Sequence, residues 1–267
     1  MSVSKRPDYS SFAKIIASCA QTRDLAQGRR AHESILQSGQ SLDRYLANLL
    51  IRMYARCGSL EDAIRVFDSI PAKNVFSYSA MISALFQDGN PQESKRIFDR
   101  MPCRDLVIWT SMISGYADCG TTREAGWIFD RMPAWSVFSC NVLLAAKIQS
   151  GQIDAVRSFF EIMPQRDVFS VTSMITAYGR NLDIAQSKRF FDTLCSRGLI
   201  PWNSMITAFG DNSLIEDAKA TFEKMPMRNT SSWNAMLQAY SQNGELPAAR
   251  VLFSQIPAPN AVSRTAL

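Results

Sequence analysis

The nine residues AIRVFDSIP, at positions 63–71, return along the chain at a fixed interval of 31 residues. Their phenylalanine marks the interval without gap or insertion, in the series Phe67, Phe98, Phe129, Phe160, Phe191, Phe222 and Phe253. An apolar residue followed by proline comes three or four residues later in every copy except one, which has Leu194 and Cys195. A fixed period of about 20–50 residues indicates an array of one repeated supersecondary unit.

Each period carries the pattern of two short helices. In the unit 106–136, the first apolar residues are spaced i, i+3, i+4, i+7, which predicts one buried helix face: Trp109, Met112, Ile113 and Tyr116. Gly120 follows, where a helix end favours a left-handed residue. A second apolar face runs from Ala125 to Met132, and Pro133 is expected to stop that helix. Because two helices and their turns fill the unit, the sequence predicts an all-α solenoid of helix-turn-helix repeats.

The periodicity also divides the chain. We expect an N-terminal tail at 1–8 and an array of eight helical-hairpin repeats over 9–260, followed at 261–267 by the start of a truncated further repeat. The repeat boundaries are 9–43, 44–74, 75–105, 106–136, 137–167, 168–198, 199–229 and 230–260. The opening repeat is longer than the others.

Composition narrows the function classes. The formal net charge is +5, from 29 basic and 24 acidic residues, which is compatible with a nucleic-acid partner without indicating one. Six cysteines form no C-x-x-C pair, so we expect reduced structural thiols and no metal site. No apolar run approaches the length of a membrane span, and the first residues resemble neither a signal peptide nor a transit peptide.

Two positions of the unit are chemically restricted. The fifth residue is always Asn, Ser or Thr: Asn48, Ser79, Thr110, Asn141, Thr172, Asn203 and Asn234. A merely solvated helix face would accept Lys, Glu and Gln equally well, so this restriction favours a functional role. The last residue is restricted as well: Asn74, Asp105, Ser136, Asp167, Gly198, Asn229 and Asn260. These residue types are also the preferred helix N-caps, so capping and ligand binding both remain open there.

The chain resembles the pentatricopeptide repeat (PPR) family over nearly its whole length. The resemblance is carried by RYLANLLIRMYARCGSLEDAIRVFDSIP, LVIWTSMISGYADCGTTREAGWIFDRMP and TSSWNAMLQAYSQNGELPAARVLFSQIP. The 31-residue units are similar to the short repeat type of the plant-type (PLS-like) subfamily. The resemblance implies a right-handed superhelix that binds single-stranded RNA, one base per repeat. It further implies location in a mitochondrion or chloroplast and a role in RNA processing or C-to-U editing. A deaminase or other processing protein would then act in trans.

The family's binding residues can be carried over position by position. The fifth and last residues are implied to read the base edge, and the second residue to stack between bases. The stacking residues are then Tyr45, Phe76, Val107, Phe138, Phe169 and Ile200, with Ser231 as the polar exception. The implied target is 5′-Y-G-N-U-N-Y-Y-3′, with the protein N-terminus at the RNA 5′ end. Here G is assigned to Ser79 with Asp105, and U to Asn141 with Asp167.

The sequence offers no catalytic constellation. A zinc deaminase needs an H-x-E motif and a C-x-x-C pair, whereas His32 is the only histidine and is followed directly by Glu33. We therefore expect neither an enzyme nor a cofactor. The alternative function is a helical-repeat scaffold that binds a protein partner, as tetratricopeptide arrays do. A basic residue stands before the last position at Lys73, Arg104, Arg166, Arg197 and Arg228. It either neutralises phosphates, interacts with the helix C-termini or is simply a solvated charge.

Overall fold

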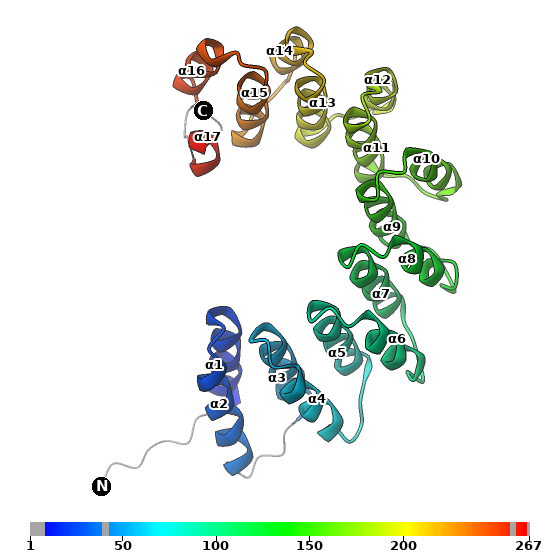
Figure 1. The fold of residues 1–267 in the computed structure, drawn as a ribbon, viewed down its shortest axis with the longest axis vertical. Helices are drawn as coiled ribbons and strands as arrows, with labels where there is room; N and C mark the ends of the chain where they lie inside the picture. The colour runs from blue at the N-terminus through cyan, green and yellow to red at the C-terminus, as the bar shows by residue number, and fades with distance from the viewer. Residues whose placement is uncertain (1–8, 39–42, 257–259, 266–267) are drawn as a thin grey trace. The chain divides into compact units, whose positions relative to one another are not determined.

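The computed structural model describes residues 9–38, 43–256 and 260–265, and the regular secondary structure of these residues is entirely helical (Figure 1). The first helices of successive pairs are α1 (Tyr9–Thr22), α3 (Arg44–Arg56), α5 (Val75–Gln87), α7 (Leu106–Asp118), α9 (Val137–Gln149), α11 (Val168–Arg180), α13 (Leu199–Asp211) and α15 (Thr230–Gln242). The second helices are α2 (Leu25–Gln37), α4 (Leu60–Ser69), α6 (Pro91–Asp99), α8 (Thr122–Phe129), α10 (Ile153–Ile162), α12 (Ile184–Thr193), α14 (Ile215–Glu223) and α16 (Leu246–Ser254). A short helix, α17 (Ala261–Thr265), follows. The expected tail at 1–8 and Pro257 lie outside the described residues.

The chain forms two compact units, residues 1–146 and 147–267. In the N-terminal unit, α1, α3, α5 and α7 lie side by side as one layer, and each of α2, α4, α6 and α8 packs on its own partner (Figure 1). In the C-terminal unit, α11, α13, α15 and α17 form the corresponding layer, with α12, α14 and α16 behind it. Second helices also contact the first helix of the next pair, which is the packing of a solenoid.

Each first helix ends at a residue in the left-handed conformation. Gly58, Gly89, Gly120, Gly151 and Gly244 have φ between 72° and 77°. The same place is taken by Arg23, Leu182 and Ser213, whose φ values are 56°, 62° and 58°. A side chain in this region costs about 1 kcal/mol or more, since its Cβ crowds the following carbonyl. Leu182, which is 74% exposed, recovers little of this by packing.

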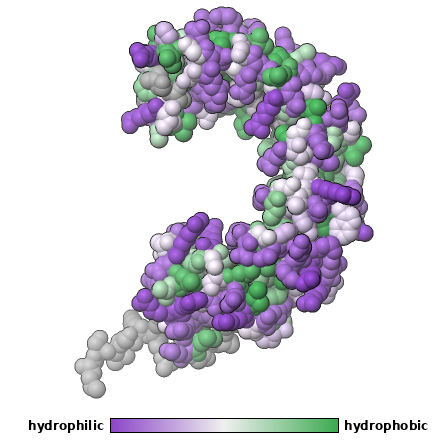
Figure 2. Space-filling view, viewed as in Figure 1, coloured by the Kyte–Doolittle hydropathy of each residue, from purple (hydrophilic) through white to green (hydrophobic). Residues whose placement is uncertain are grey.

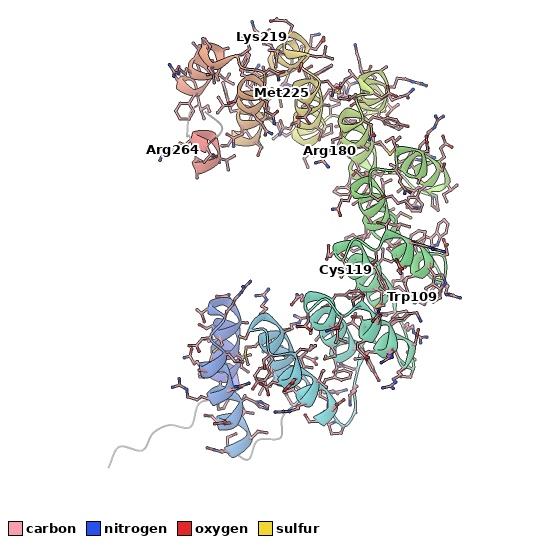
Figure 3. All side chains as sticks on the ribbon, in the orientation of Figure 1. Trp109, Cys119, Arg180, Lys219, Met225 and Arg264 are labelled. Carbon is pink, nitrogen blue, oxygen red and sulfur yellow. The ribbon has the colours of Figure 1, made fainter. Side chains whose placement is uncertain are left out.

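The repeated phenylalanines lie in the seam between consecutive pairs. Six of the seven are buried, and Phe253 is half-buried. Where the next unit has an aromatic residue at its fourth position, the rings meet edge-on; the Phe98–Trp109 and Phe222–Trp233 centroids are 4.8 and 5.1 Å apart. Such geometry adds about 0.5–1.5 kcal/mol to the burial of each pair. Figure 3 shows Trp109 on α7 at the side facing α6.

The basic residue before the last position serves the helix end. Arg228 donates from Nε to the Phe222 carbonyl (3.0 Å) and from Nη2 to the Glu223 carbonyl (2.9 Å). Its guanidinium lies 4.7 Å from the centre of the Phe222 ring. We call this arrangement the Phe–Arg clamp, and it recurs at Arg104, Arg166 and Arg197. The explanation by helix ends is therefore the correct one for this stripe.

In the unit 106–136, a tryptophan takes the place of the clamp arginine. Trp135 stands at the position of the arginine, with its ring 4.7 Å from that of Phe129. The preceding helix, α8, ends at Phe129, although the apolar spacing predicted a helix through Met132. Met132 is nevertheless buried, because a turn that bonds its N–H to the Phe129 carbonyl carries it back onto the core. The apolar spacing thus predicted correctly that Met132 is buried, but its prediction of where the helix ends was wrong.

The first helices of the C-terminal unit approach each other closely. A Cβ atom on Gly210 would lie 2.6 Å from the Cβ of Ala239, so only glycine fits there. Asn243 bridges the same two helices by donating from Nδ2 to the Gly210 carbonyl at 2.9 Å. The arrangement repeats one unit earlier with Gly179, Ala208 and Asn212. These contacts hold the edges of α11, α13 and α15 in register.

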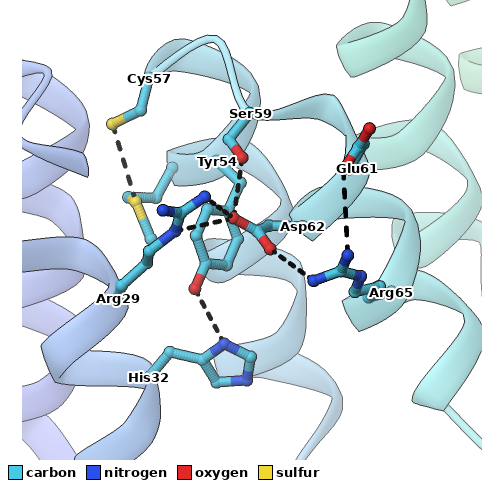
Figure 4. A network of polar contacts seen from close by, with 9 residues as sticks. Arg29, His32, Tyr54, Cys57, Ser59, Glu61, Asp62 and Arg65 are labelled. Atoms are coloured by element: carbon cyan, nitrogen blue, oxygen red, sulfur yellow. Dashed lines mark hydrogen bonds and ion pairs between the residues drawn. The ribbon is translucent and has the colours of Figure 1, made fainter. Parts of the chain in front are cut away.

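A polar cluster joins α2, α3 and α4 (Figure 4). Arg29 pairs with Asp62 at 2.8 Å, and Ser59 donates to the same carboxylate. Burial opposes ionisation of Asp62, but the hydrogen bonds from Ser59 and Arg29 lower its pKa overall. His32 Nδ1 lies 2.9 Å from the Tyr54 hydroxyl, and burial lowers the histidine pKa while raising that of Tyr54 to about 12. The cluster lies beside the apolar core of the opening pair, to which Phe12, Ile16 and Ile35 belong.

Candidate nucleic-acid interface

The last residue of each unit is the N-cap of the next first helix. Its side-chain oxygen accepts a hydrogen bond from the backbone N–H three residues later, at 2.8–3.1 Å. The residues that cap in this way are Asn74, Asp105, Ser136, Asp167, Asn229 and Asn260. Gly198 has no side chain and makes no such bond. Capping therefore accounts for the restriction at this position.

In Asn229 and Asp105, the cap bond uses one of the two polar atoms at the end of the side chain and leaves the other outside that bond. An Asn whose Oδ1 accepts the cap bond turns its Nδ2, with two N–H groups, away from the helix. An Asp in the same place turns a second carboxylate oxygen outward. Asn229 and Asp105 thus present opposite groups, a donor and an acceptor, at the same point of the repeat. The N-cap fixes both side chains, so little rotamer freedom remains to be lost on binding.

The fifth residues lie one turn into the first helices and are shielded. The Oδ1 atoms of Asn48, Asn203 and Asn234 are buried and have no hydrogen-bond partner among the described residues. A buried carbonyl oxygen left without a partner is costly, so these amides are suited to an incoming ligand. Thr110 and Thr172 are also buried, and their hydroxyls donate to the Leu106 and Val168 carbonyls at 2.7 and 2.6 Å. Because each hydroxyl already donates its hydrogen, its oxygen can still accept a hydrogen bond from a ligand.

The second residues of the units are large, apolar and exposed. Their exposed fractions lie between 55% and 70%, for Tyr45, Phe76, Val107, Phe138, Phe169 and Ile200. Apolar residues of the N-terminal unit are visible as small groups among hydrophilic ones in Figure 2. A repeated exposed aromatic or aliphatic residue at one position of a helix is unusual without a partner. Flat rings at this place can stack on nucleobases.

Three cavities have the same lining. One of about 660 Å³ in the N-terminal unit is lined by Tyr45, Asn48, Asn74 and Phe76. A second is lined by Val107, Thr110, Ser136 and Phe138. In the C-terminal unit, a cavity of about 470 Å³ is lined by Ile200, Asn203, Asn229 and Ser231. The lining of each therefore includes a fifth residue, a last residue and two consecutive second residues. Asn234 and Asn260 are also brought together, by a 3.5 Å contact between Nδ2 and Oδ1.

The remaining sequence-predicted residues occupy the same places on their own helices. Ser79 is half-buried on α5, and Asp105 caps α7. Asn141 is 8% exposed on α9 in the N-terminal unit. Asp167 caps α11 in the C-terminal unit.

Positive charge at these cavities was missed by sequence reasoning. Arg44 and Arg52 line the first cavity, and Arg180 lines the one in the C-terminal unit. Figure 3 shows Arg180 at the end of α11 on the side away from α12. Arg52 makes no ion pair within the described part of the chain. The sequence spacing does indicate Arg52, because it follows Asn48 by one helical turn and so lies on the same helix face.

The described residues also bear on metal binding and membrane insertion. Over 9–38, 43–256 and 260–265, no three His, Cys, Asp or Glu side chains are grouped as metal ligands. All six cysteines are free thiols. Among the helices described, none is both long and apolar enough to cross a bilayer.

These features define an α-helical repeat protein in which most repeats carry one polar pair and one exposed apolar residue. A family model described as "PPR repeat" matches residues 45–75, 76–106, 107–137, 169–199, 200–230 and 231–257. More than half of the chain is matched, and the chain belongs to the PPR repeat family. The repeat 137–167 and the opening pair are not among the matched ranges.

Similar proteins agree with this assignment. "Pentatricopeptide repeat-containing protein At5g27110" of Arabidopsis thaliana is 39% identical over 91 residues, 34% of this chain and 13% of that protein. The mitochondrial protein At3g53360 and the chloroplastic protein At1g15510, both also of Arabidopsis thaliana, are 42% and 36% identical. The matches cover 29% and 32% of this chain, and 10% of each of those proteins. The chain thus matches only a small part of these relatives' length.

Solved structures share the fold. The crystal structure of the pentatricopeptide repeat protein PPR10 in complex with an 18-nt psaJ RNA element has a TM-score of 0.69 to this chain, with 19% identity. The alignment covers 97% of this chain and 42% of PPR10. PPR10 from maize, in a further crystal structure, gives a TM-score of 0.64, with 17% identity over 97% of this chain and 46% of that one.

Proposed function

We propose that this protein binds single-stranded RNA in a sequence-dependent manner, with one base per repeat. The observation that carries the proposal is the recurrence of one constellation, in which two exposed second residues line the same cavity as a fifth and a last residue. Second residues would stack on the bases, while the polar pair would meet the base edge. Arg44, Arg52 and Arg180 would supply the sequence-independent attraction to phosphates.

The cap geometry gives the last residue a defined chemical preference. Uracil and guanine carry an N–H at the centre of the Watson–Crick edge, which suits the carboxylate oxygen of Asp105 that lies outside the cap bond. Cytosine has a lone pair there, which suits the outward Nδ2 of Asn74 or Asn229. These preferences are consistent with G for Ser79 with Asp105, U for Asn141 with Asp167, and pyrimidines for the Asn pairs. The proposed target is 5′-Y-G-N-U-N-Y-Y-3′.

We further propose an array of eight repeats, from 9–43 to 230–260, that selects sites for organellar RNA processing or C-to-U editing. Relatives named mitochondrial or chloroplastic support the compartment. In this role the protein is not itself an enzyme, and a deaminase or processing protein would act in trans. The alternative is a scaffold for a protein partner. The invariably short polar fifth residue argues against it, because a peptide groove would vary that position.

The proposal is tested by fluorescence anisotropy at a fixed salt concentration. The probe is a labelled, unstructured RNA carrying C-G-A-U-A-C-C, compared with RNAs in which the G or the U is replaced. Each replacement should cost about 1–3 kcal/mol. Replacement of the base assigned to Thr172 and Gly198 is the matched control and should cost little. Binding that ignores sequence and fades with salt would indicate only a basic surface, and absence of binding would favour the scaffold.

A further inference from the structure

A further cavity, of about 380 Å³, adjoins the first one in the N-terminal unit. Its lining comes from α1, α3 and α5, and it shares Leu49 and Arg52 with the first cavity. Among the described residues that line it, every polar side chain can donate a hydrogen bond and none is a carboxylate. These polar residues are Gln21, Arg52, Arg56, Ser83 and Gln87. The cavity is therefore suited to an anionic group.

The two arginines of this cavity have donors to spare. Arg52 and Arg56 are exposed on α3, and neither makes an ion pair or a hydrogen bond within the described residues. The clamp arginines differ, because Arg104 and Arg228 donate to main-chain carbonyls. A guanidinium carries five N–H donors in a rigid fork that matches the oxygens of a phosphate. An incoming phosphate would thus meet two cations that no other group of the described chain occupies.

Spacing along α3 connects these arginines with the polar pair of the same repeat. Arg52 follows Asn48 by four residues and Arg56 follows it by eight, so the three lie on one face of the helix. Consecutive members of this set are about 6 Å apart along the helix axis. A nucleotide whose base faces Asn48 and Asn74 would therefore have both cations beside it on the same helix.

In the C-terminal unit, the corresponding charges offset each other. Asp211 follows Asn203 by eight residues, as Arg56 follows Asn48. It lines the cavity of that unit together with Arg180 from the preceding repeat. Burial raises the pKa of Asp211, and the charge of Arg180 acts against that rise, so the two side chains interact. A phosphate at this place would gain from the arginine and lose to the carboxylate.

We propose that the cavity of α1, α3 and α5 holds the RNA backbone, with Arg52 and Arg56 in contact with the phosphates on either side of the base that Asn48 and Asn74 face. This inference rests on the proposed function, which places single-stranded RNA along the first helices. Base reading is then spread over the array, whereas the sequence-independent attraction is concentrated in the N-terminal unit, at the 5′ end of the target. Asp211 weakens that attraction in the C-terminal unit.

The first test is the salt dependence of binding, measured by anisotropy with the C-G-A-U-A-C-C RNA. On a single strand, each phosphate contact adds about 0.7 to the slope of log affinity against log salt. The double variant Arg52→Gln, Arg56→Gln should lose two contacts, so the wild type's advantage over it should shrink by about sevenfold between 50 and 200 mM salt. Its discrimination of G and U should be unchanged. The matched control is Arg123→Gln, which removes an exposed arginine of α8 and should leave the slope as it is.

The second test removes the charge from the RNA instead. A methylphosphonate linkage replaces the phosphates on either side of the first C, the base assigned to Asn48 and Asn74. The wild type should lose affinity, whereas the double variant should lose little, because its contacts are already gone. The same replacement beside the last C, assigned to Asn234 and Asn260, should cost the wild type little. Asp211→Asn should raise affinity for all RNAs alike, and most at low salt.

The outcomes separate the two proposals. A wild-type protein that does not distinguish bases overturns the proposed function, and this inference with it. A wild-type protein that distinguishes G and U at their assigned places, but whose salt slope is the same as that of the double variant, overturns this inference alone. Equal losses from the methylphosphonates at the first and the last C also overturn it, because that result describes a uniform attraction along the array.

Discussion

Replacing Asn229 by aspartate changes one outward atom and keeps the cap. In the wild type, Oδ1 accepts from the Ser232 backbone N–H and hydroxyl, each at 3.0 Å. A carboxylate accepts the same two bonds, and the helix N-terminus favours its charge by about 0.3–1 kcal/mol. The outward group changes from an N–H donor to an oxygen acceptor. Under the proposed function, the preferred base should therefore change from cytosine to uracil.

The size of the change follows from the pairing. One matched contact is lost with cytosine and one is gained with uracil, each about 1–3 kcal/mol, so the C-to-U difference should move by about 2–6 kcal/mol. The new negative charge also repels phosphates, which should lower affinity for all RNAs equally. The ratio between RNAs is thus the informative quantity, and the absolute affinity is not.

The assay is anisotropy with four RNAs that differ only at the assigned base, alongside thermal unfolding to verify that the cap is retained. The matched control is Asp183→Asn, which makes the reverse exchange at a second-helix N-cap, where Asp183 accepts from the Gln186 backbone N–H at 3.1 Å. The control should leave base preference unchanged. An Asn229→Asp protein whose affinity shifts equally for all four RNAs would refute the reasoning and leave Asn229 as a cap only.

Three further predictions concern stability. Phe222→Ala should destabilise the C-terminal unit by about 3–5 kcal/mol in denaturant unfolding, since it empties the seam against Trp233; an effect below about 1 kcal/mol would contradict that packing. Leu182→Gly should raise the melting temperature by relieving φ +62°, with a gain of up to about 1 kcal/mol, whereas Gly151→Leu should lower it. His32 has a pKa lowered by burial, so stability is present above its usual pKa and is lost as pH falls through the lower folded value. His32→Gln should therefore melt with a smaller difference between about pH 7.5 and about pH 5 than the wild type, and an equal difference would exclude His32 as a cause.

The sequence sufficed for the helical pairs because their signals are local and repeated. The spacing of apolar residues, the glycines after first helices and the phenylalanine series each depend on a few neighbours in the chain. Two departures from the repeat pattern could be recognised only in the structure. Leu182 takes a left-handed conformation that its type disfavours, because neighbouring repeats impose the turn. Trp135 packs its ring beside Phe129 at the position where other repeats have the clamp arginine, a substitution that residue type alone does not predict.

The arginine stripe illustrates a limit of pattern reasoning. Residue type and spacing were equally compatible with phosphate contacts and with helix ends. Only the hydrogen bonds of Arg104 and Arg228 to main-chain carbonyls decided the matter. Conversely, Arg52 and Arg180 line the cavities and belong to no stripe, so a search for repetition passed over them. A charged residue that occurs in only one or two repeats is not detected by comparing the repeats with one another.

The last residue of the repeat carries two roles that constrain each other. Capping admits few residue types, and each type turns one fixed group outward: N–H from Asn, oxygen from Asp. Under the proposed function, this position can therefore report little more than whether the base edge has a donor or an acceptor at its centre. Purine and pyrimidine must then be separated by the fifth residue. Gly198 offers neither a cap nor an outward group, so its repeat should not distinguish bases by the donor or acceptor at the centre of their edge.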